Sequence, residues 1–351
     1  MKILKRIITL FITIALSIEI SNIQYTASAS TNFNRQNMIK AGVLLYSFDD
    51  LYMNNLKQNL ENFQNTKNNV NFTFFTSKDN QAIQNEILDS LFKDNYNLIM
   101  LNLINPTKEQ LTDIINKARQ KNISLIFFDI NPSDIINDSY DKVAFFITDS
   151  NKLGNLQGEI LATEWNKNKN ILDKNNDNVL QYILLKGTTN SLVTTERTNA
   201  VIAKLKDSGI NLQELDSVNA FWDKDFAESA IGSLYLKYDG AIEAIISNND
   251  AMAIGAVASL QKYGYNKGDN SKYIPVVGID GLKEAKDLID KGIMTGTVSQ
   301  DLDILADSLY NVGMNLIYNE DSLQSVPYKL VNDKIVVTLP YSIYTKQSKN
   351  N

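Results

Sequence analysis

The chain has 351 residues, 44% of them hydrophobic, which is enough for two domains with apolar cores. Its net charge of −6 is spread over interspersed acidic and basic residues, which argues against binding to nucleic acid or to an anionic membrane surface. It contains no cysteine and no histidine, which excludes disulfides, thiol nucleophiles, Ser-His-Asp triads and the common zinc sites.

The first 29 residues have the pattern of an export signal. Three basic residues lie within the first six, residues 7–18 are apolar, and Ala27 and Ala29 provide a small-x-small cleavage site. The apolar run is shorter than a membrane span and is followed by Glu19. We therefore expect an exported protein, soluble in the periplasm or outside the cell after cleavage. The absence of cysteine excludes a lipoprotein anchor.

Strand-like and helix-like segments alternate from residue 41 to residue 128. The expected strands are 41–46, 71–75, 98–103 and 124–128. The expected helices are one that begins near Met53, then 81–93 and 108–121, the last preceded by a capping box of Thr107 and Gln110. This alternation is typical of a doubly wound parallel sheet.

After an expected strand at 143–147 the alternation starts again. The expected helices are 152–165, 194–207, 224–238, 251–263, 282–291 and 301–318. The expected strands are 180–185, 212–216, 242–247, 274–279 and 295–298, followed by a hairpin of 328–332 and 334–339. Two similar α/β domains are therefore predicted, with a ligand between them as the default site. The polar tail 346–351 is expected to be disordered.

The stretch 240–256 predicts a buried strand that delivers polar groups to the carboxyl edge of a sheet. Asn248, Asn249 and Asp250 follow the strand, where ligands bind in open parallel sheets. Glu243 lies inside the apolar strand and must face water, a partner or a metal. The alternative is a simple helix cap with a Glu exposed at a sheet edge.

The loop that begins at Asp173 has the ligand order of an EF-hand calcium loop. Oxygen donors occupy loop positions 1, 3, 5, 7 and 9, and they belong to Asp173, Asn175, Asp177, the Val179 carbonyl and Gln181. Asn178 stands at position 6 in place of Gly and tolerates the same turn. Position 12 is Leu184, which cannot bind a metal.

A loop without its last carboxylate needs one from elsewhere in the fold. Glu243, on a strand expected beside 180–185, can supply it and would complete a structural Ca²⁺ site. The alternative is a solvated turn, because similar Asn-rich loops occur at 65–71 and 266–271.

Several stretches, in order, resemble the bacterial periplasmic galactose/glucose-binding proteins, which are type I substrate-binding proteins. They are YSFDDLYM (46–53), SYDKVAFFITDS (139–150), VLQYILLKG (179–187), NNDAMAIG (248–255), PVVGID (275–280) and GTV (296–298). The resemblance runs from about residue 41 to residue 341. It implies two doubly wound lobes joined by three crossovers, with calcium in the second lobe completed at Glu243. The implied lobes are 38–148 plus 300–331 and 149–299 plus 332–345.

The resemblance assigns nine positions to the sugar. They are Asp50, Tyr52, Asp129, Ser191, Arg197, Trp222, Asn249, Asp280 and Gln300. The carboxylates, amides and guanidinium would bind hydroxyls, and the two aromatic residues would lie on the faces of the ring. Taken singly, each residue has a structural alternative as a core aromatic, a helix cap or a surface charge.

The sequence departs from the family pattern at five of these or neighbouring positions. Tyr52 stands where the family commonly has Phe, Asp129 and Gln300 stand where it has Asn, and Ser191 and Val193 stand where it has His and Asp. Losing a buried polar partner costs roughly 1–3 kcal/mol per group. Galactose or glucose is therefore not assumed, and a pentose or another sugar without the hydroxymethyl group is an open alternative.

These patterns predict a non-catalytic, monomeric protein that delivers a monosaccharide to the permease of an ABC importer by hinge closure. The alternative is a sensor that presents the same sugar to the ectodomain of a chemoreceptor or a histidine kinase. An enzyme is not expected, because the chain has no G-x-S-x-G motif and no phosphate loop. A transcription regulator is disfavoured, because an export signal stands where a helix-turn-helix would be.

Overall fold

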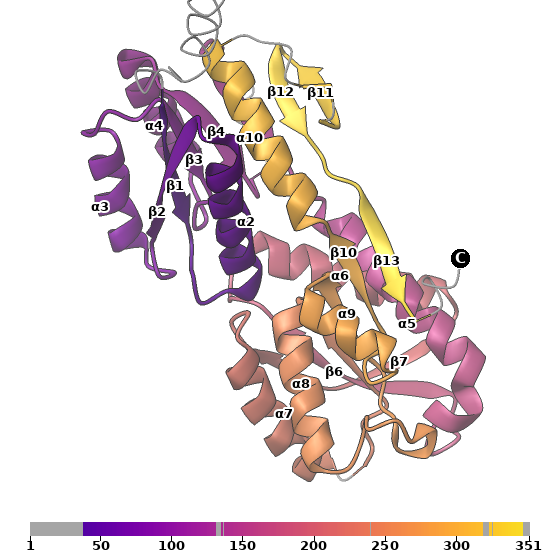
Figure 1. Cartoon of the computed structure of the whole chain (residues 1–351). Coiled ribbons are helices and arrows are strands. Elements are labelled where there is room, and N and C mark those ends of the chain that lie inside the picture. Colours follow the sequence, from indigo (N-terminus) through magenta and orange to yellow (C-terminus); the bar gives the residue numbers. More distant parts are fainter. Residues whose placement is uncertain are drawn as a thin grey trace, which may run out of the picture. The chain divides into compact units, whose positions relative to one another are not determined.

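The computed structural model describes residues 38–130, 135, 137–238, 240–318, 323, 324 and 326–346 (Figure 1). The predicted export signal and the tail from residue 347 lie outside this range. Apart from Ile39, which begins the first strand, the elements below belong to one compact unit, Lys40–Asn351. No helix in the described range is long and apolar enough to span a membrane.

The first lobe is built on a seven-stranded sheet with the order β11-β12-β5-β4-β3-β1-β2. Its strands are β1 (Ile39–Leu45), β2 (Val70–Thr76), β3 (Leu98–Leu101), β4 (Ser124–Phe128), β5 (Val143–Phe146), β11 (Tyr328–Val331) and β12 (Lys334–Val337). Its helices are α2 (Leu51–Lys67), α3 (Gln81–Leu91), α4 (Lys108–Lys121) and α10 (Leu302–Tyr318). The pairs β1–β3, β3–β4, β4–β5 and β5–β12 are parallel, whereas β11 and β12 form the predicted hairpin.

Successive side chains of the central strands point to opposite faces of this sheet, and apolar side chains occur on both faces. Helices therefore cover both faces. Ile99 and Leu101 of β3 belong to the cluster that contains the apolar side chains of α3 and α4. Leu98 and Met100 of the same strand face α10, where a Cβ on Gly313 would lie 2.5 Å from the Leu98 side chain. Strands that are apolar on both sides fit a parallel sheet between two layers of helices.

The second lobe is built on a six-stranded sheet with the order β13-β10-β9-β8-β6-β7. Its strands are β6 (Val179–Lys186), β7 (Asn211–Asn219), β8 (Ala244–Ser247), β9 (Val276–Asp280), β10 (Gly296–Gln300) and β13 (Tyr341–Thr345). Its helices are α5 (Ser150–Leu172), α6 (Leu192–Asp207), α7 (Lys224–Tyr238), α8 (Asp250–Lys262) and α9 (Lys283–Asp290), with a short 3₁₀ turn η2 (Asn270–Lys272). One core joins the sheet to α7, α8 and α9, and another joins it to α5 and α6.

The predicted fold class, two doubly wound α/β lobes, is confirmed. The crossovers are also visible in the strand order. The chain passes from β5 to the second sheet, returns from β10 to α10, and crosses again between β12 and β13, whose ribbons are yellow in Figure 1.

The last lobe boundary differs from the predicted one after residue 331. β12 pairs with β5 in the first sheet, so the chain leaves that sheet after Val337. It then forms β13, an antiparallel partner of β10 that was not predicted. Its half-buried sequence YSIYT follows Pro340 directly, and a single strand added at a sheet edge has no helix after it to mark it.

Candidate functional site

The carboxyl ends of β8, β9 and β10 bring together polar side chains from distant parts of the chain. Arg197 of α6 is only 6% exposed, and its Nη1 donates to the backbone carbonyl of Asn248 at 2.8 Å. The same Nη1 lies 3.7 Å from Oδ1 of Asp280, the last residue of β9. Gln300 ends β10, and its Nε2 donates to that Asp280 oxygen at 3.2 Å. A charged group is costly to bury without an opposite charge or a hydrogen bond. The contacts among Arg197, Asp280 and Gln300 therefore offset part of the cost of burying them.

The indole ring of Trp222 lies beside the guanidinium group of Arg197. The guanidinium carbon of Arg197 lies 5.8 Å from the centre of the indole. The indole rests on Gly187, where a Cβ would come within 2.0 Å of the ring, and its Nε1 donates to Thr188 Oγ1 at 3.3 Å. Phe221 and Trp222 both have positive φ, 55° and 64°. Bulky residues rarely adopt this conformation, and such strain is found at functional sites.

Asn249 caps a helix and also contacts the segment that carries Trp222. Its Oδ1 accepts a hydrogen bond from Met252 N at 3.0 Å and so caps α8. Its Nδ2 donates to the Trp222 carbonyl at 3.4 Å, which links the start of α8 to the backbone of Trp222. We call Arg197, Trp222, Asn249, Asp280 and Gln300 the carboxyl-end cluster.

The first lobe supplies two more of the predicted carboxylates. Asp50 caps α2 by accepting from Met53 N at 2.9 Å, and it also accepts from the Tyr46 hydroxyl at 2.5 Å. Asp129 follows β4 with a φ of 59° and accepts from Thr148 Oγ1 at 2.5 Å and from Asn102 Nδ2 at 3.1 Å. Each carboxylate therefore sits at the carboxyl edge of the first sheet and is oriented by its neighbours.

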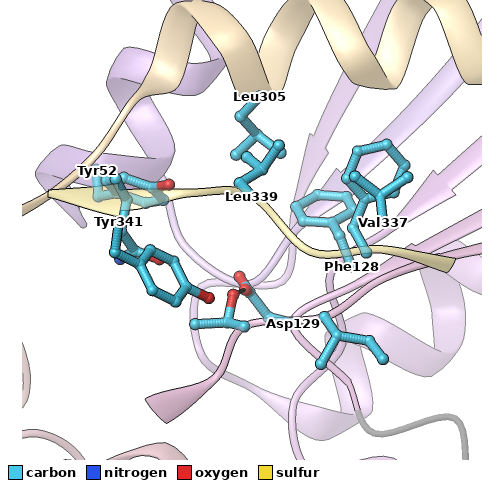
Figure 2. Close-up of a pocket in the computed structure, with 11 residues that line it drawn as sticks. Tyr52, Phe128, Asp129, Leu305, Val337, Leu339 and Tyr341 are labelled. Atoms are coloured by element: carbon cyan, nitrogen blue, oxygen red, sulfur yellow. Dashed lines mark hydrogen bonds between the residues drawn. The ribbon is translucent and has the colours of Figure 1, made fainter. Parts of the chain in front are cut away.

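Side chains of the two lobes meet in this region. Tyr52 belongs to α2, yet it packs against the core cluster that contains α7, α8 and α9. With Asp129, Gln300 and Tyr341 it also lines a small cavity of about 20 Å³. Figure 2 shows the hydroxyl of Tyr341 and the carboxylate of Asp129 turned toward one another at one side of it.

Burial dominates the electrostatics of these carboxylates. Desolvation raises the pKa of Asp50, of Asp129 and, most strongly, of Asp280, and in all three the positive charge of Arg197 opposes the rise. Burial also raises the pKa of Asp250 to about 7. Oδ1 of Asp250 has no hydrogen-bond partner, whereas its Oδ2 accepts from Leu282 N at 2.8 Å. Asp250 is fully buried against Gly278 of β9, so its carboxyl belongs to the interior of the lobe behind the carboxyl-end residues.

Ser191 stands apart from the other predicted residues. Its hydroxyl caps α6 by accepting from Thr194 N at 3.4 Å. Within the described part of the chain, no hydrogen bond, ion pair or ring contact joins it to the other eight. The contacts of Ser191 are therefore those of a helix cap.

The predicted metal loop lies at the opposite, amino end of β6 and β8. Glu243 immediately precedes β8 and is 1% exposed. Its two carboxylate oxygens accept from Lys174 N at 2.6 Å and from Gln181 N at 3.0 Å. The expected neighbourhood of Glu243 and the loop is therefore confirmed. We call Asp173, Asn175, Asp177, Val179, Gln181 and Glu243 the amino-end cluster.

Within the loop the side chains bond mainly to one another and to backbone N–H groups. Asp173 accepts from the N–H groups of Asp177 and Asn178 at 3.1 and 3.0 Å. Asp177 Oδ2 accepts from the amides of Asn175 and Gln181 at 2.9 and 2.8 Å. Asn178 has a φ of 65°, the left-handed conformation expected at this position.

The oxygen donors of the amino-end cluster fit a hard cation only in part. No group of three or more acidic side chains stands close enough to hold a metal among the residues that the structure describes. Two observations nevertheless match the chemistry of Ca²⁺. Oε1 of Gln181 is buried without a hydrogen-bond partner, and burial raises the pKa of Glu243, with the nearby charge of Asp173 adding to the rise. Oxygen donors of this kind, mixed between carboxylate and amide, suit calcium.

Four further polar residues belong to the region and were not predicted. They are Tyr46, Asn102, Thr148 and Tyr341. The first three follow β1, β3 and β5 closely, so the rule that ligands bind at carboxyl ends of parallel strands would have found them. Tyr341 begins an antiparallel strand and carries no such signal.

The chain is similar to known binding proteins over most of its length. A family model described as "Periplasmic binding protein domain" matches residues 41–321. The D-galactose/methyl-galactoside binding periplasmic protein MglB of Haemophilus influenzae is 31% identical over 315 residues, which cover 90% of this chain and 91% of that protein. The D-xylose-binding periplasmic protein of the same organism is 25% identical and covers 78% of this chain and 77% of its own.

Solved structures agree in fold. A solute-binding protein from Bacillus halodurans with bound myo-inositol has a TM-score of 0.70 at 19% identity, covering 90% of this chain and 98% of that one. A protein from Mycobacterium smegmatis in complex with β-D-fucofuranose has a TM-score of 0.71 at 16% identity, covering 89% of this chain and 93% of that one. At these identities the likeness concerns the fold alone.

Proposed function

From the premise that the chain belongs to the periplasmic binding protein family, we propose that it binds a monosaccharide outside the cytoplasm and delivers it to an ABC importer. It is a binding protein and not an enzyme. The observation that carries the sugar proposal is the carboxyl-end cluster, in which Arg197, Asp280 and Gln300 are buried together beside the indole of Trp222. Planar hydrogen-bonding groups next to an aromatic face suit a sugar ring.

The finer choice of sugar rests on the substituted positions. The relative that covers most of the chain is named for galactose, and another is named for xylose. Ser191, which serves as a helix cap, and Val193 offer fewer polar partners at the head of α6 than a His and an Asp would. A sugar that lacks the hydroxymethyl group is therefore proposed beside galactose and glucose.

Sugar binding is tested by calorimetry with a panel of hexoses and pentoses on the purified chain. We expect at least one monosaccharide to bind, and Arg197→Met to abolish its heat. Absence of heat with every sugar would contradict the proposal.

Delivery would proceed by closure of the two lobes on the sugar. A ligand that contacts both sheets favours the arrangement in which both are engaged. Asp50 and Tyr52 on one lobe and Arg197 and Asp280 on the other supply such contacts. Small-angle scattering with and without sugar tests this, and an unchanged radius of gyration would argue against closure.

The partner would be the importer's permease, to which an exported, monomeric protein carries the sugar. Relatives named as periplasmic binding proteins favour delivery over presentation to a sensor. Capture of the sugar-bound protein by the permease in detergent tests this, and capture by a chemoreceptor or histidine-kinase ectodomain alone would point to sensing.

A structural calcium ion is proposed at the amino-end cluster. Asp173, Asn175, Asp177, Gln181 and Glu243 would supply side-chain oxygens and Val179 its carbonyl. The ion would supply positive charge among carboxylates at the end of β8. Lys174 donates through Nζ to the carbonyl of Ile242 at 2.6 Å, which holds the loop beside Glu243. Titration of chelator-treated protein with Ca²⁺ tests the site, and no heat would contradict it.

A further inference from the structure

A small recess that is apolar on one side adjoins the predicted sugar site. Six apolar residues line it, and they are Phe128, Phe146, Ile147, Leu305, Val337 and Leu339. The cavity measures about 20 Å³, which is room for one non-hydrogen group. Three of the predicted sugar residues, Tyr52, Asp129 and Gln300, line it as well, so the recess is continuous with the site.

Several polar atoms at one side of this recess already have hydrogen-bond partners. Both oxygens of Asp129 accept hydrogen bonds, from Thr148 and from Asn102. The amide nitrogen of Gln300 donates to Asp280, and the Tyr341 hydroxyl accepts from Asp149 N at 2.8 Å. Figure 2 shows Leu305, Leu339, Phe128 and Val337 gathered away from the oxygens of Asp129 and Tyr341. A hydroxyl placed among these apolar side chains would lose its hydrogen bonds to water without replacing them.

We infer that the recess receives a methyl substituent of the sugar ring, so that the preferred ligand is a 6-deoxyhexose. This inference rests on the proposed function and names the ligand class of the same site. A methyl group buries apolar surface in the recess, which a pentose cannot do because it has no group there. A hydroxymethyl group would place its hydroxyl against the apolar side of the recess, or would have to compete for polar atoms that already have partners.

Two series of sugars isolate this one substituent. D-Fucose, D-galactose and L-arabinose share their ring configuration and carry a methyl group, a hydroxymethyl group and a hydrogen. The corresponding gluco series is 6-deoxy-D-glucose, D-glucose and D-xylose. We expect the deoxy sugar of the series that binds to have a dissociation constant about tenfold lower than its hydroxymethyl parent and about fourfold lower than the pentose.

Variants at the recess give a second measurement by calorimetry on the full chain. Leu339→Phe fills the recess and should remove the advantage of the deoxy sugar while it leaves the pentose affinity unchanged. Thr338→Phe adds the same ring at the preceding exposed residue and should leave the ranking as in the wild type. Leu339→Gln places an amide in the recess and should move the preference toward the hydroxymethyl sugar.

The outcomes separate this inference from the proposed function. If a pentose or a hydroxymethyl sugar binds as tightly as the deoxy sugar, or if Leu339→Phe weakens all three equally, the recess does not select the ligand, although sugar binding stands. If none of the six sugars binds but another monosaccharide does, the inference fails and the proposed function stands; only absence of binding with every monosaccharide would contradict both. Thermal unfolding of each variant checks that it is folded. If Leu339→Phe does not fold, the order of the wild-type affinities for the three sugars decides alone.

Discussion

The amino-end and carboxyl-end clusters occupy opposite edges of the second sheet and are assembled in different ways. The amino-end cluster comes from nine consecutive residues and Glu243, and its carboxylates are held largely by backbone N–H groups. The carboxyl-end cluster takes single residues from α6, β9, β10 and two loops, and its carboxylate Asp280 faces a buried cation. A local cluster can bind a ligand without moving anything, whereas a cluster shared among elements responds to their arrangement.

The largest expected effect is at Arg197 in the carboxyl-end cluster. Arg197→Met leaves Asp280 buried without its cation, and breaking a buried pair costs about 3–5 kcal/mol of stability. We expect a clear fall in the urea midpoint together with loss of sugar binding. Arg119→Met, which breaks the more exposed pair with Asp138, is the control and should cost far less. Equal costs for both variants would mean that the cluster is not the centre of the site.

The next effect concerns the amino-end cluster and calcium. At a free Ca²⁺ concentration about 100 times its Kd, one ion would stabilise the folded protein by about 2.7 kcal/mol. EDTA should therefore lower the melting temperature of the wild type but not of Glu243→Gln. Glu214→Gln, on the neighbouring strand β7, should behave as the wild type. If neither Ca²⁺ nor EDTA changes the melting temperature of the wild type, the proposed calcium site is contradicted. Sugar affinity at saturating Ca²⁺ should be unchanged, which separates the two clusters.

A pH dependence should arise beside the carboxyl-end cluster. The pKa of Asp250 is raised by burial to about 7, above the value of about 3.9 in an unfolded chain. Between these values the folded state binds a proton that the unfolded state lacks, so the free energy of unfolding should fall as pH rises from about 4 to 7. Asp250→Asn should flatten this slope in urea titrations at pH 5, 6, 7 and 8. Exposed Asp225→Asn is the control, and equal slopes in all three proteins would rule out Asp250 as the cause.

The smallest expected effect lies on the first lobe. Tyr46→Phe removes the hydroxyl that donates to Asp50 at 2.5 Å, a loss of about 1 kcal/mol. We expect sugar affinity to fall about fivefold by calorimetry, with little change in melting temperature. Tyr96→Phe, whose ring packs against Phe75 away from Asp50, should leave affinity unchanged. An unaffected Tyr46→Phe would show that the orientation of Asp50 does not matter for binding.

Much of the fold could be predicted because parallel α/β sheets repeat one simple pattern. Helices 108–121 and 224–238 and strand 124–128 have the predicted bounds, since caps and apolar periodicity mark them. β13 and the true end of the first lobe were missed. An added antiparallel strand depends on pairing with a distant partner, here β10, and residues 341–345 alone do not contain that information.

The candidate site was predictable to a similar extent and for a similar reason. The loop of the amino-end cluster follows a spacing in the sequence, and the strand order predicted that Glu243 lies beside it, whereas the binding of a metal there stays a prediction. The role of Tyr341, and of the apolar residues around the recess, depends on three crossovers meeting at one place. Only the tertiary arrangement brings residues near 147, 305 and 339 together, and no spacing rule predicts such a meeting.

β12 and β13 follow one another in sequence, yet each covers an edge of a different sheet. β5 is an edge strand until residues 334–337 have been made, and β10 is an edge strand until residues 341–345 follow. Neither sheet is complete before these residues are present, and contacts this distant in sequence form slowly. Removal of residues 334–345 would therefore expose an unpaired strand in each lobe, a template for association with other chains.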